Sequence, residues 1–533
     1  MLTFDDRFVR ELPADPSELN KPRAVRGACF TRVTPTPARA PKLVAFSREV
    51  AAELGLSAND FESPELIEAL AGSRVLEGMK PYAACYGGHQ FGNWAGQLGD
   101  GRAITLGEVI TPSAGRLELQ LKGAGRTPYS RTADGRAVLR SSVREFLCSE
   151  AMHHLGVPTT RALSLVVTGE SVVRDVLYDG NAAPEPGAVV ARVAPSFVRF
   201  GNFELFASRG EIAPLRALAD HVIRMHYAEL LAASGMPERE TYAAFLTEVA
   251  RRTALMVMEW MRVGFVHGVM NTDNMSILGL TIDYGPYGWL EPYDPNWTPN
   301  TTDAGGRRYR YGHQPSVAGW NVARLAEALE PLVEVEADLV KALATYRDTL
   351  MASERTMLAR KLGFRELRVD GLETDVPIVE TLYRLLASTE IDTTIFHRSL
   401  LDVPIDEASL ADPSDAAIAG WIGEAYYDAS ALDGAHRTAM LGWLRTYARR
   451  AREEDAVARR TTMLAANPKY VLRNWLASVA IDAATAGDFS EVEILLDVMR
   501  RPYDEQPGRE RFAAKRPEWA RHRAGCSMLS CSS

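Results

Sequence analysis

The spacing of apolar residues changes once along this chain of 533 residues, near residue 200. Before that point, residues 117–122 alternate strictly, with every second side chain a leucine, and the runs 163–167 and 188–193 are equally strand-like. After it, apolar residues recur at helical spacing, and one long pattern from about residue 243 to 262 ends at Gly264. Strands first and helices later predict a two-lobed α+β fold rather than alternating βαβ units.

Composition narrows the classes of protein that this chain can represent. Sixty Lys and Arg against 69 Asp and Glu give a formal net charge of −9, which argues against binding to nucleic acid as a main role. The most apolar long stretch, residues 253–270, is interrupted by Glu259 and Arg262, so no membrane span is expected. The five cysteines form no CxxC pair, which favours a reducing compartment and argues against a structural zinc site. With no leader-like segment at Met1, we expect a cytoplasmic protein.

The segment after the long helical pattern carries the most specific motif. The protein-kinase pattern H-R-D-x-x-x-x-N followed by D-F-G is matched at four positions, namely His267, Asn274, Asp283 and Gly285. Val269 stands where a kinase has its base, and a carboxylate appears instead at Asp273. Asn274 and Asp283 supply the hard oxygen ligands that Mg²⁺ or Mn²⁺ requires beside a triphosphate. Taken alone, the motif also fits a turn rich in Asn and Asp.

A lysine ends the alternating strand. Lys122 lies on its polar face, where kinases place the ammonium that contacts phosphate, and Glu145 on the following predicted helix is suitably spaced to pair with it. A lysine on a strand is more often simply solvated. The prediction that Lys122 contacts phosphate therefore depends on its position upstream of the motifs at 267–274 and 283–285, in the order found in kinases. Upstream, Gly99, Gly101 and Arg102 form a tight turn that could approach phosphates, although a plain β-turn explains the turn equally well.

Two arginines flank the change from strands to helices. Arg192 and Arg199 lie where a cleft between the two lobes is expected, and surface salt bridges are the alternative interpretation.

With these pieces in order, the chain resembles the selenoprotein O family, also called the YdiU family, of kinase-fold proteins once labelled pseudokinases. The resemblance spans nearly the whole chain and rests on the segments 88–92, 98–103, 121–131, 134–137, 271–276 and 467–474. It implies a bilobal protein-kinase-like fold, in which residues 1–78 form an N-terminal extension, 79–199 a strand-rich N-lobe with one key helix, 200–500 a helical C-lobe, and 501–533 a C-terminal tail.

The same resemblance implies protein adenylylation, in which AMP moves from ATP to a Ser, Thr or Tyr hydroxyl and pyrophosphate leaves. UMP transfer from UTP is also attributed to this family. Family members bind ATP in an orientation inverted relative to kinases. By motif, the nucleotide is expected to contact nine residues, namely Gly99, Gly101, Arg102, Lys122, Asp134, Gly135, Arg192, Arg199 and Asp283. Asn274 and Asp283 are expected to bind Mg²⁺ or Mn²⁺, Asp273 to accept the hydroxyl proton, and Glu145 to orient Lys122.

The tail adds one further point of resemblance. Family members with selenocysteine carry it third from the C-terminus, where this chain has Cys531. A redox role through a disulfide is implied by the family alone, and residues 284–320 contain no cysteine, which leaves Cys526 as the nearest partner in sequence. A polar tail with incidental thiols is the other interpretation.

Three functions stay open at this point. They are an adenylyltransferase, an ordinary phosphotransferase that uses the γ-phosphate, and a nucleotide-binding protein without turnover. The valine at position 269 argues against the second, and the presence of Lys122, Asn274 and Asp283 argues against the third.

Overall fold

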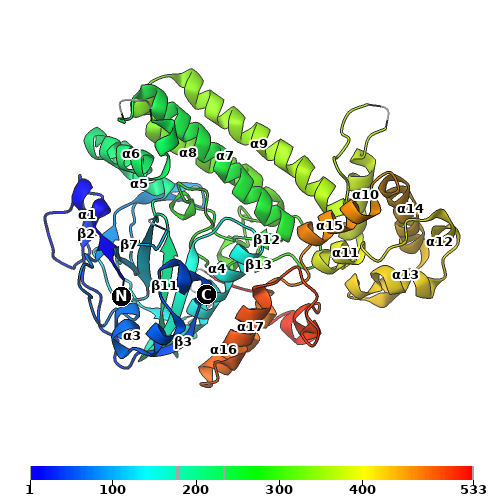
Figure 1. The fold of residues 1–533 in the computed structure, drawn as a ribbon, viewed down its shortest axis with the longest axis horizontal. Helices are drawn as coiled ribbons and strands as arrows, with labels where there is room; N and C mark the ends of the chain where they lie inside the picture. The colour runs from blue at the N-terminus through cyan, green and yellow to red at the C-terminus, as the bar shows by residue number, and fades with distance from the viewer. Residues whose placement is uncertain (1, 114, 176–179, 232–234, 372, 531–533) are drawn as a thin grey trace.

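A computed structural model describes residues 2–113, 115–175, 180–231, 235–371 and 373–530. Figure 1 shows a strand-rich part built from the first half of the chain, a row of long helices beside it, and a separate helical group at the far end. The predicted α+β class is confirmed, because the sheet is completed before residue 200 and the rest of the described chain is mostly helical.

An antiparallel sheet forms the first part. Its central strands follow the order β2-β4-β7-β8-β11-β10-β3, while β1 pairs with β7 and β9 pairs with β11. The strands are β1 (Phe4–Asp5), β2 (Phe30–Arg32), β3 (Lys42–Phe46), β4 (Tyr82–Ala84), β7 (Ala103–Ile110), β8 (Arg116–Lys122), β9 (Ala137–Val138), β10 (Arg161–Arg174) and β11 (Ala183–Ala194). A separate hairpin consists of β5 (Gly87–Gln90) and β6 (Asn93–Gln97).

Strand β8 is buried on both faces. Leu119 and Leu121 lie in the apolar core on one face, as the alternation predicts. The polar residues of the other face, Glu118, Gln120 and Lys122, are also almost inaccessible to solvent. The alternation therefore separates an apolar interior from a polar interior, and Lys122 of the polar face lines a cavity.

The N-terminal segment does more than cover the sheet. Its strands β1, β2 and β3 enter the sheet itself, and the helices α2 (Arg48–Glu53) and α3 (Pro64–Leu70) pack on the face that carries Leu119 and Leu121. The sequence analysis found no strands here, because segments of two to five residues are too short to display a period.

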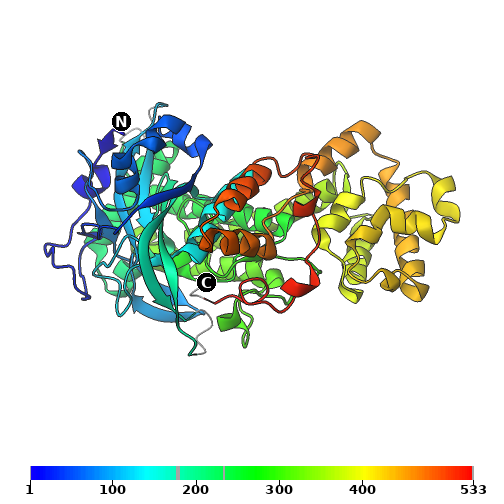
Figure 2. The ribbon, with the colours of Figure 1, turned by 90° about the horizontal axis from the view of Figure 1, so that it is seen from below.

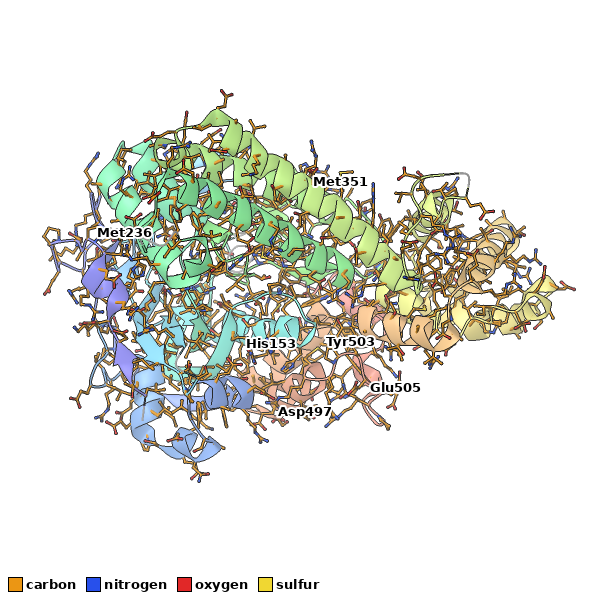
Figure 3. All side chains as sticks on the ribbon, turned by 45° about the horizontal axis from the view of Figure 1, so that its top comes forward. His153, Met236, Met351, Asp497, Tyr503 and Glu505 are labelled. Carbon is orange, nitrogen blue, oxygen red and sulfur yellow. The ribbon has the colours of Figure 1, made fainter. Side chains whose placement is uncertain are left out.

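Helix α4 (Leu139–His154) contacts β10 and β11 of the sheet and also two helices from the end of the chain, α16 (Asn474–Thr485) and α17 (Ser490–Met499). Figure 2 shows α16 and α17 between the sheet and the far helical group. The loop after α17 extends this contact, because the Tyr503 hydroxyl donates to the Leu155 carbonyl oxygen at 2.7 Å. Figure 3 shows Tyr503 near the end of α4 that carries His153.

The helices after the sheet form two groups with separate cores. The first group shares its core with α4 and comprises α5 (Phe200–Ser208), α6 (Ile212–His226), α7 (Arg239–Val263), α8 (Gln314–Val333) and α9 (Glu336–Leu362). The second comprises α10 (Val376–Ser388), α11 (Thr393–Ser399), α12 (Glu407–Ala411), α13 (Asp415–Ile422), α14 (Gly434–Ala451) and α15 (Ala456–Ala466). Helix α7 ends where predicted, since Gly264 adopts the left-handed conformation with φ of 76°.

The remaining short elements connect these groups. They include α1 (Arg7–Glu11), β12 (Phe265–Val266), β13 (Gly288–Trp289) and the 3₁₀ turn η3 (Thr272–Asn274). Within the described part of the chain, no helix combines the length and the apolar character needed to cross a lipid bilayer.

Candidate functional site

A cavity of about 710 Å³ opens between the polar interior of the sheet and the loops that follow α7. Most of the residues predicted for the site line this cavity, namely Gly99, Gly101, Arg102, Lys122, Asp134, Gly135, Arg192, Arg199, Asp273, Asn274 and Asp283. Glu145 lies directly behind Lys122 rather than on the wall. The structure therefore brings together residues that lie up to 184 positions apart in sequence, from both parts of the fold.

Lys122 joins the sheet to helix α4. Its Nζ lies 2.5 Å from Glu145 Oε2 and 3.4 Å from Asp283 Oδ1, and Glu145 is buried. Burial lowers the pKa of Lys122, while the two carboxylates favour its charged form. The predicted pair between the strand lysine and the helix glutamate is therefore present in the folded chain, and Lys122 is not a solvated surface residue.

Asp283 is surrounded by three cations. Arg192 Nη1 lies 2.6 Å from its Oδ1, Arg199 pairs with its Oδ2, and Lys122 approaches Oδ1. Burial opposes ionisation of this carboxyl, but Arg199, Arg192 and Lys122 outweigh burial and hold its pKa well below the usual range. The residue adopts φ of 59°, a left-handed conformation that a non-glycine residue rarely takes. The tertiary contacts thus hold Asp283 in an unusual backbone conformation with its carboxylate ionised.

The two arginines are buried, each only 1 to 2% exposed, and do not make surface salt bridges. Arg192 also pairs with Glu145 at 2.8 Å and donates to Gln120 Oε1. Arg199 stacks on Tyr86, with its Cζ 4.8 Å from the ring centroid. Each guanidinium is held from several sides, so both cations are positioned before any ligand arrives.

The turn η3 brings Asp273 and Asn274 to the cavity. Arg199 Nη1 donates to the Asp273 carbonyl oxygen at 2.9 Å, which ties this turn to the start of α5. The Asn274 side chain donates through Nδ2 to the Val269 carbonyl oxygen at 3.0 Å, and its Oδ1 is the remaining ligand atom of this amide. Burial raises the pKa of Asp273 to about 7, against the opposing effects of Arg199 and a hydrogen bond from Gln90.

Glycines form the opposite wall of the cavity. A Cβ at Gly99 would lie 2.5 Å from the Tyr129 ring, and one at Gly135 would lie 2.2 Å from the Gly125 carbonyl oxygen, so no side chain fits at either position. Beside them, Asp134 pairs with Arg174 at 2.8 Å at the rim of the cavity, and Arg102 is half-buried. Packing against Tyr129 and Gly125 therefore requires glycine at these two positions of the cavity wall.

The donor set fits a divalent cation. Asp283 offers a carboxylate and Asn274 an amide oxygen, both on the wall of one cavity, and hard oxygen ligands of this kind suit Mg²⁺ or Mn²⁺. Lysine and arginine side chains outnumber carboxylates on the wall of this cavity, and that positive excess is complementary to phosphate groups.

Three residues of the site escaped the sequence analysis. Gln90 contacts Asp273, Tyr86 stacks on Arg199, and the buried Asp100 lies 3.8 Å from Arg199. Gln90 belongs to the segment 88–92 and Asp100 to the segment 98–103, both of which carry the family resemblance, so the signal for these two was present but was not assigned a role.

The predicted tail cysteines are only partly covered by the structure. Cys526 is buried, forms no disulfide with another cysteine of the described ranges, and donates a hydrogen bond to Ser478 Oγ at 3.2 Å. Cys531 lies outside the described residues.

Comparison with known proteins identifies the family. A family model described as "Protein adenylyltransferase SelO" matches residues 22–500. A relative from Azoarcus sp. (strain BH72) is 59% identical over 534 residues, which cover 100% of this chain and 99% of the relative. Another, from Rhodopirellula baltica, is 58% identical over 542 residues, with the same coverage. Both relatives are described as "Protein nucleotidyltransferase YdiU".

One solved structure also aligns with this chain. It is ROP2 from Toxoplasma gondii, described as a virulence factor with a protein-kinase fold and no enzymatic activity, at 10% identity and a TM-score of 0.24 over 55% of this chain and 89% of that chain. A likeness this low carries no argument. The family match and the two full-length relatives do, and they confirm the resemblance: the chain belongs to the SelO family of protein adenylyltransferases.

Proposed function

We propose that this chain transfers AMP from ATP to a Ser, Thr or Tyr hydroxyl of another protein and releases pyrophosphate, with UTP as a second donor that yields UMP. The observation that carries the proposal is the convergence of Lys122, Arg192 and Arg199 on Asp283, in the same cavity as Asp273 and Asn274. Membership in a family of protein adenylyltransferases supports the choice of reaction.

The bonds exchanged in this reaction define what the residues must do. The acceptor hydroxyl oxygen forms a bond to the α-phosphorus, the bond between that phosphorus and the bridging oxygen to the β-phosphate breaks, and the hydroxyl proton leaves. Asp273 accepts this proton. Its carboxylate is the acidic group of the loop 269–274, since Val269 occupies the position of the kinase base.

Negative charge grows on the departing pyrophosphate, and fixed cations stabilise it. Arg192, Arg199 and Lys122 are held in place by carboxylates, so little reorganisation is needed when these cations contact phosphates. The nucleotide contacts the glycine turns at Gly99 and Gly135, which line the cavity next to Arg102 and Asp134. Glu145 keeps Lys122 directed into the cavity. Asn274 and Asp283 would hold Mg²⁺ or Mn²⁺, which supplies further charge neutralisation on the phosphates.

Parallel incubations with α-labelled and γ-labelled ATP test this proposal. AMP transfer predicts that only the α label becomes attached to protein, and that Asp283→Ala abolishes the attachment. Incorporation of the γ label alone would instead identify a phosphotransferase, and ATP binding without either label on protein would identify a nucleotide-binding protein. A matched control is Asp497→Ala, a surface carboxylate far from the cavity, which is expected to leave incorporation unchanged.

A further inference from the structure

The hairpin β5–β6 carries the segment Gly88-His89-Gln90-Phe91-Gly92, to which the proposed mechanism gives no role. It lies directly against the loop that holds Asp273. The His89 amide donates to Thr272 Oγ1 at 2.7 Å, and the Phe91 amide donates to Asn271 Oδ1 at 3.2 Å. These contacts join residues at least 180 positions apart, so the hairpin is a fixed neighbour of this loop.

The hairpin is also held from its other side. His89 Nδ1 lies 2.5 Å from Glu204 Oε2 on helix α5. A Cβ at Gly201 would lie 2.1 Å from the Gly87 carbonyl oxygen, and one at Gly88 would lie 3.0 Å from Asp273 Cβ. With no room on either side, small displacements of this hairpin are transmitted to Asp273.

The Asp273 carboxylate has few hydrogen-bond partners. Its Oδ2 accepts a hydrogen bond from Gln90 Nε2 at 3.2 Å, whereas its Oδ1 is buried and has no partner among the described residues. An ionised carboxylate can accept about four hydrogen bonds. Because Oδ1 is buried, an acceptor hydroxyl must use Oδ2, the oxygen that Gln90 contacts, and Gln90 itself lines the cavity.

From these contacts we infer that Gln90 is a positioning residue, which holds the Asp273 carboxylate in the orientation that receives the proton of the acceptor hydroxyl. The inference rests on the proposed function. Arg199 competes with Gln90 for the Asp273 carboxylate. Its guanidinium already binds the Asp273 carbonyl oxygen and favours the charged carboxylate. Without the Gln90 amide, the carboxylate is free to turn toward Arg199 and away from the hydroxyl.

The test measures kcat and KM separately in the full-length chain. Initial rates of AMP incorporation are measured over a range of ATP concentrations, with synthetic peptides that each carry one Ser, Thr or Tyr as the acceptors. Gln90→Leu is expected to lower kcat by about 10- to 100-fold while KM for ATP and the melting temperature stay unchanged. Gly88→Ala should also lower kcat and leave KM for ATP unchanged, because it displaces the same carboxylate without removing a donor, and its crowded Cβ is expected to lower the melting temperature.

Asn93→Ala is the matched control, since this exposed amide lies on the same hairpin and does not line the cavity. It is expected to leave kcat unchanged. Full kcat in Gln90→Leu, or a loss that appears in KM for ATP alone, would overturn the inference while wild type and Asp273→Asn still behave as the proposed function requires. Absence of α-label incorporation in wild type, or full activity in Asp273→Asn, would overturn the proposed function and this inference together.

Discussion

Arg192 Nη1 lies 2.6 Å from Asp283 Oδ1 and 2.8 Å from Glu145 Oε1, so one guanidinium bridges helix α4 and the loop that carries Asp283. Glu145 belongs to the strand-rich part of the chain and Asp283 to the part that follows α7. The relative position of the two parts is therefore fixed at the functional site, where a nucleotide needs contacts from both.

Replacing this guanidinium by an ammonium tests its geometry. We expect Arg192→Lys to lower kcat/KM for ATP by about 10- to 100-fold, because a lysine cannot hold Gln120, Glu145 and Asp283 at once. Steady-state AMP incorporation measures the loss. Arg161→Lys is the control, since Arg161 is also buried and paired with a carboxylate, Glu150, but does not line the cavity. Equal losses in both variants would mean that the effect comes from folding.

Glu145 acts through the lysine that it holds. In Glu145→Gln, the 2.5 Å ion pair with Lys122 becomes a weaker hydrogen bond, and burial then disfavours the charged form of Lys122. We expect kcat/KM for ATP to fall by at least about tenfold, which is the effect of about 1.4 kcal/mol. Raising the pH should deepen the loss as the buried amine gives up its proton, since the variant lacks the carboxylate that favours the ammonium. A loss that does not vary between pH 6 and 9 would contradict this account of Glu145.

Helix α16 supports helix α4 through one amide. Asn474 Nδ2 donates to the Cys526 carbonyl oxygen at 2.9 Å, and Arg144, the neighbour of Glu145, reaches both Asn474 Oδ1 at 3.4 Å and the Tyr287 carbonyl oxygen at 2.8 Å. We expect Asn474→Ala to lower kcat severalfold and to speed amide hydrogen exchange in residues 285–288. Ser478→Ala is the control, because Ser478 contacts the same tail one turn along α16 without touching Arg144. Unchanged hydrogen exchange in Asn474→Ala would show that Asn474 does not support the segment 285–288.

Two carboxylates oppose each other across β7 and β8, where Glu108 and Glu118 are register partners. Burial, and then the charge of Glu108, raise the pKa of Glu118 to about 8. A carboxyl whose folded pKa lies above its unfolded value binds more protons in the folded state, so its contribution to stability is lost as the pH rises from about 4.5 to 8.

Glu118→Gln removes the titrating carboxyl and therefore the loss of folding stability that accompanies its ionisation. We expect the variant to melt on the order of 2–4 °C above wild type at pH 8.5, with little difference at pH 5. Thermal unfolding followed by circular dichroism at both pH values measures it. The exposed Glu77 provides the control Glu77→Gln, for which no pH-dependent difference is expected. A difference of the same size at both pH values would assign the effect to packing rather than to ionisation.

Patterns within one segment predicted the parts of the site that lie on regular elements. Three local patterns did this: the alternation that ends at Lys122, the helix that bears Glu145, and the spacing between Asn274 and Asp283. Each depends on residues close together in sequence, and the structure brings these four residues together. Contacts set by tertiary packing could not be predicted in this way. The bond from Gln90 to Asp273 joins positions 183 residues apart, and no local period reports it.

In the fold, too, elements with a long local pattern were predictable and contacts set by packing were not. Long helices such as α7 were predictable because their apolar stripe extends over several turns and a glycine ends them. The three short strands of the N-terminal segment, and the separation of the later helices into two cores, depend on which faces meet. Helical spacing shows that a face is apolar without showing its partner.

We expect ATP to lie in this cavity with its α-phosphorus directed toward Asp273. A crystal structure of the full-length chain with a non-hydrolysable ATP analogue and Mg²⁺ tests this most directly. In that structure the α-phosphorus should face the Asp273 carboxylate, and the terminal phosphates should contact Lys122, Arg192 and Arg199. A γ-phosphorus facing Asp273, or an analogue bound outside the cavity, would contradict it.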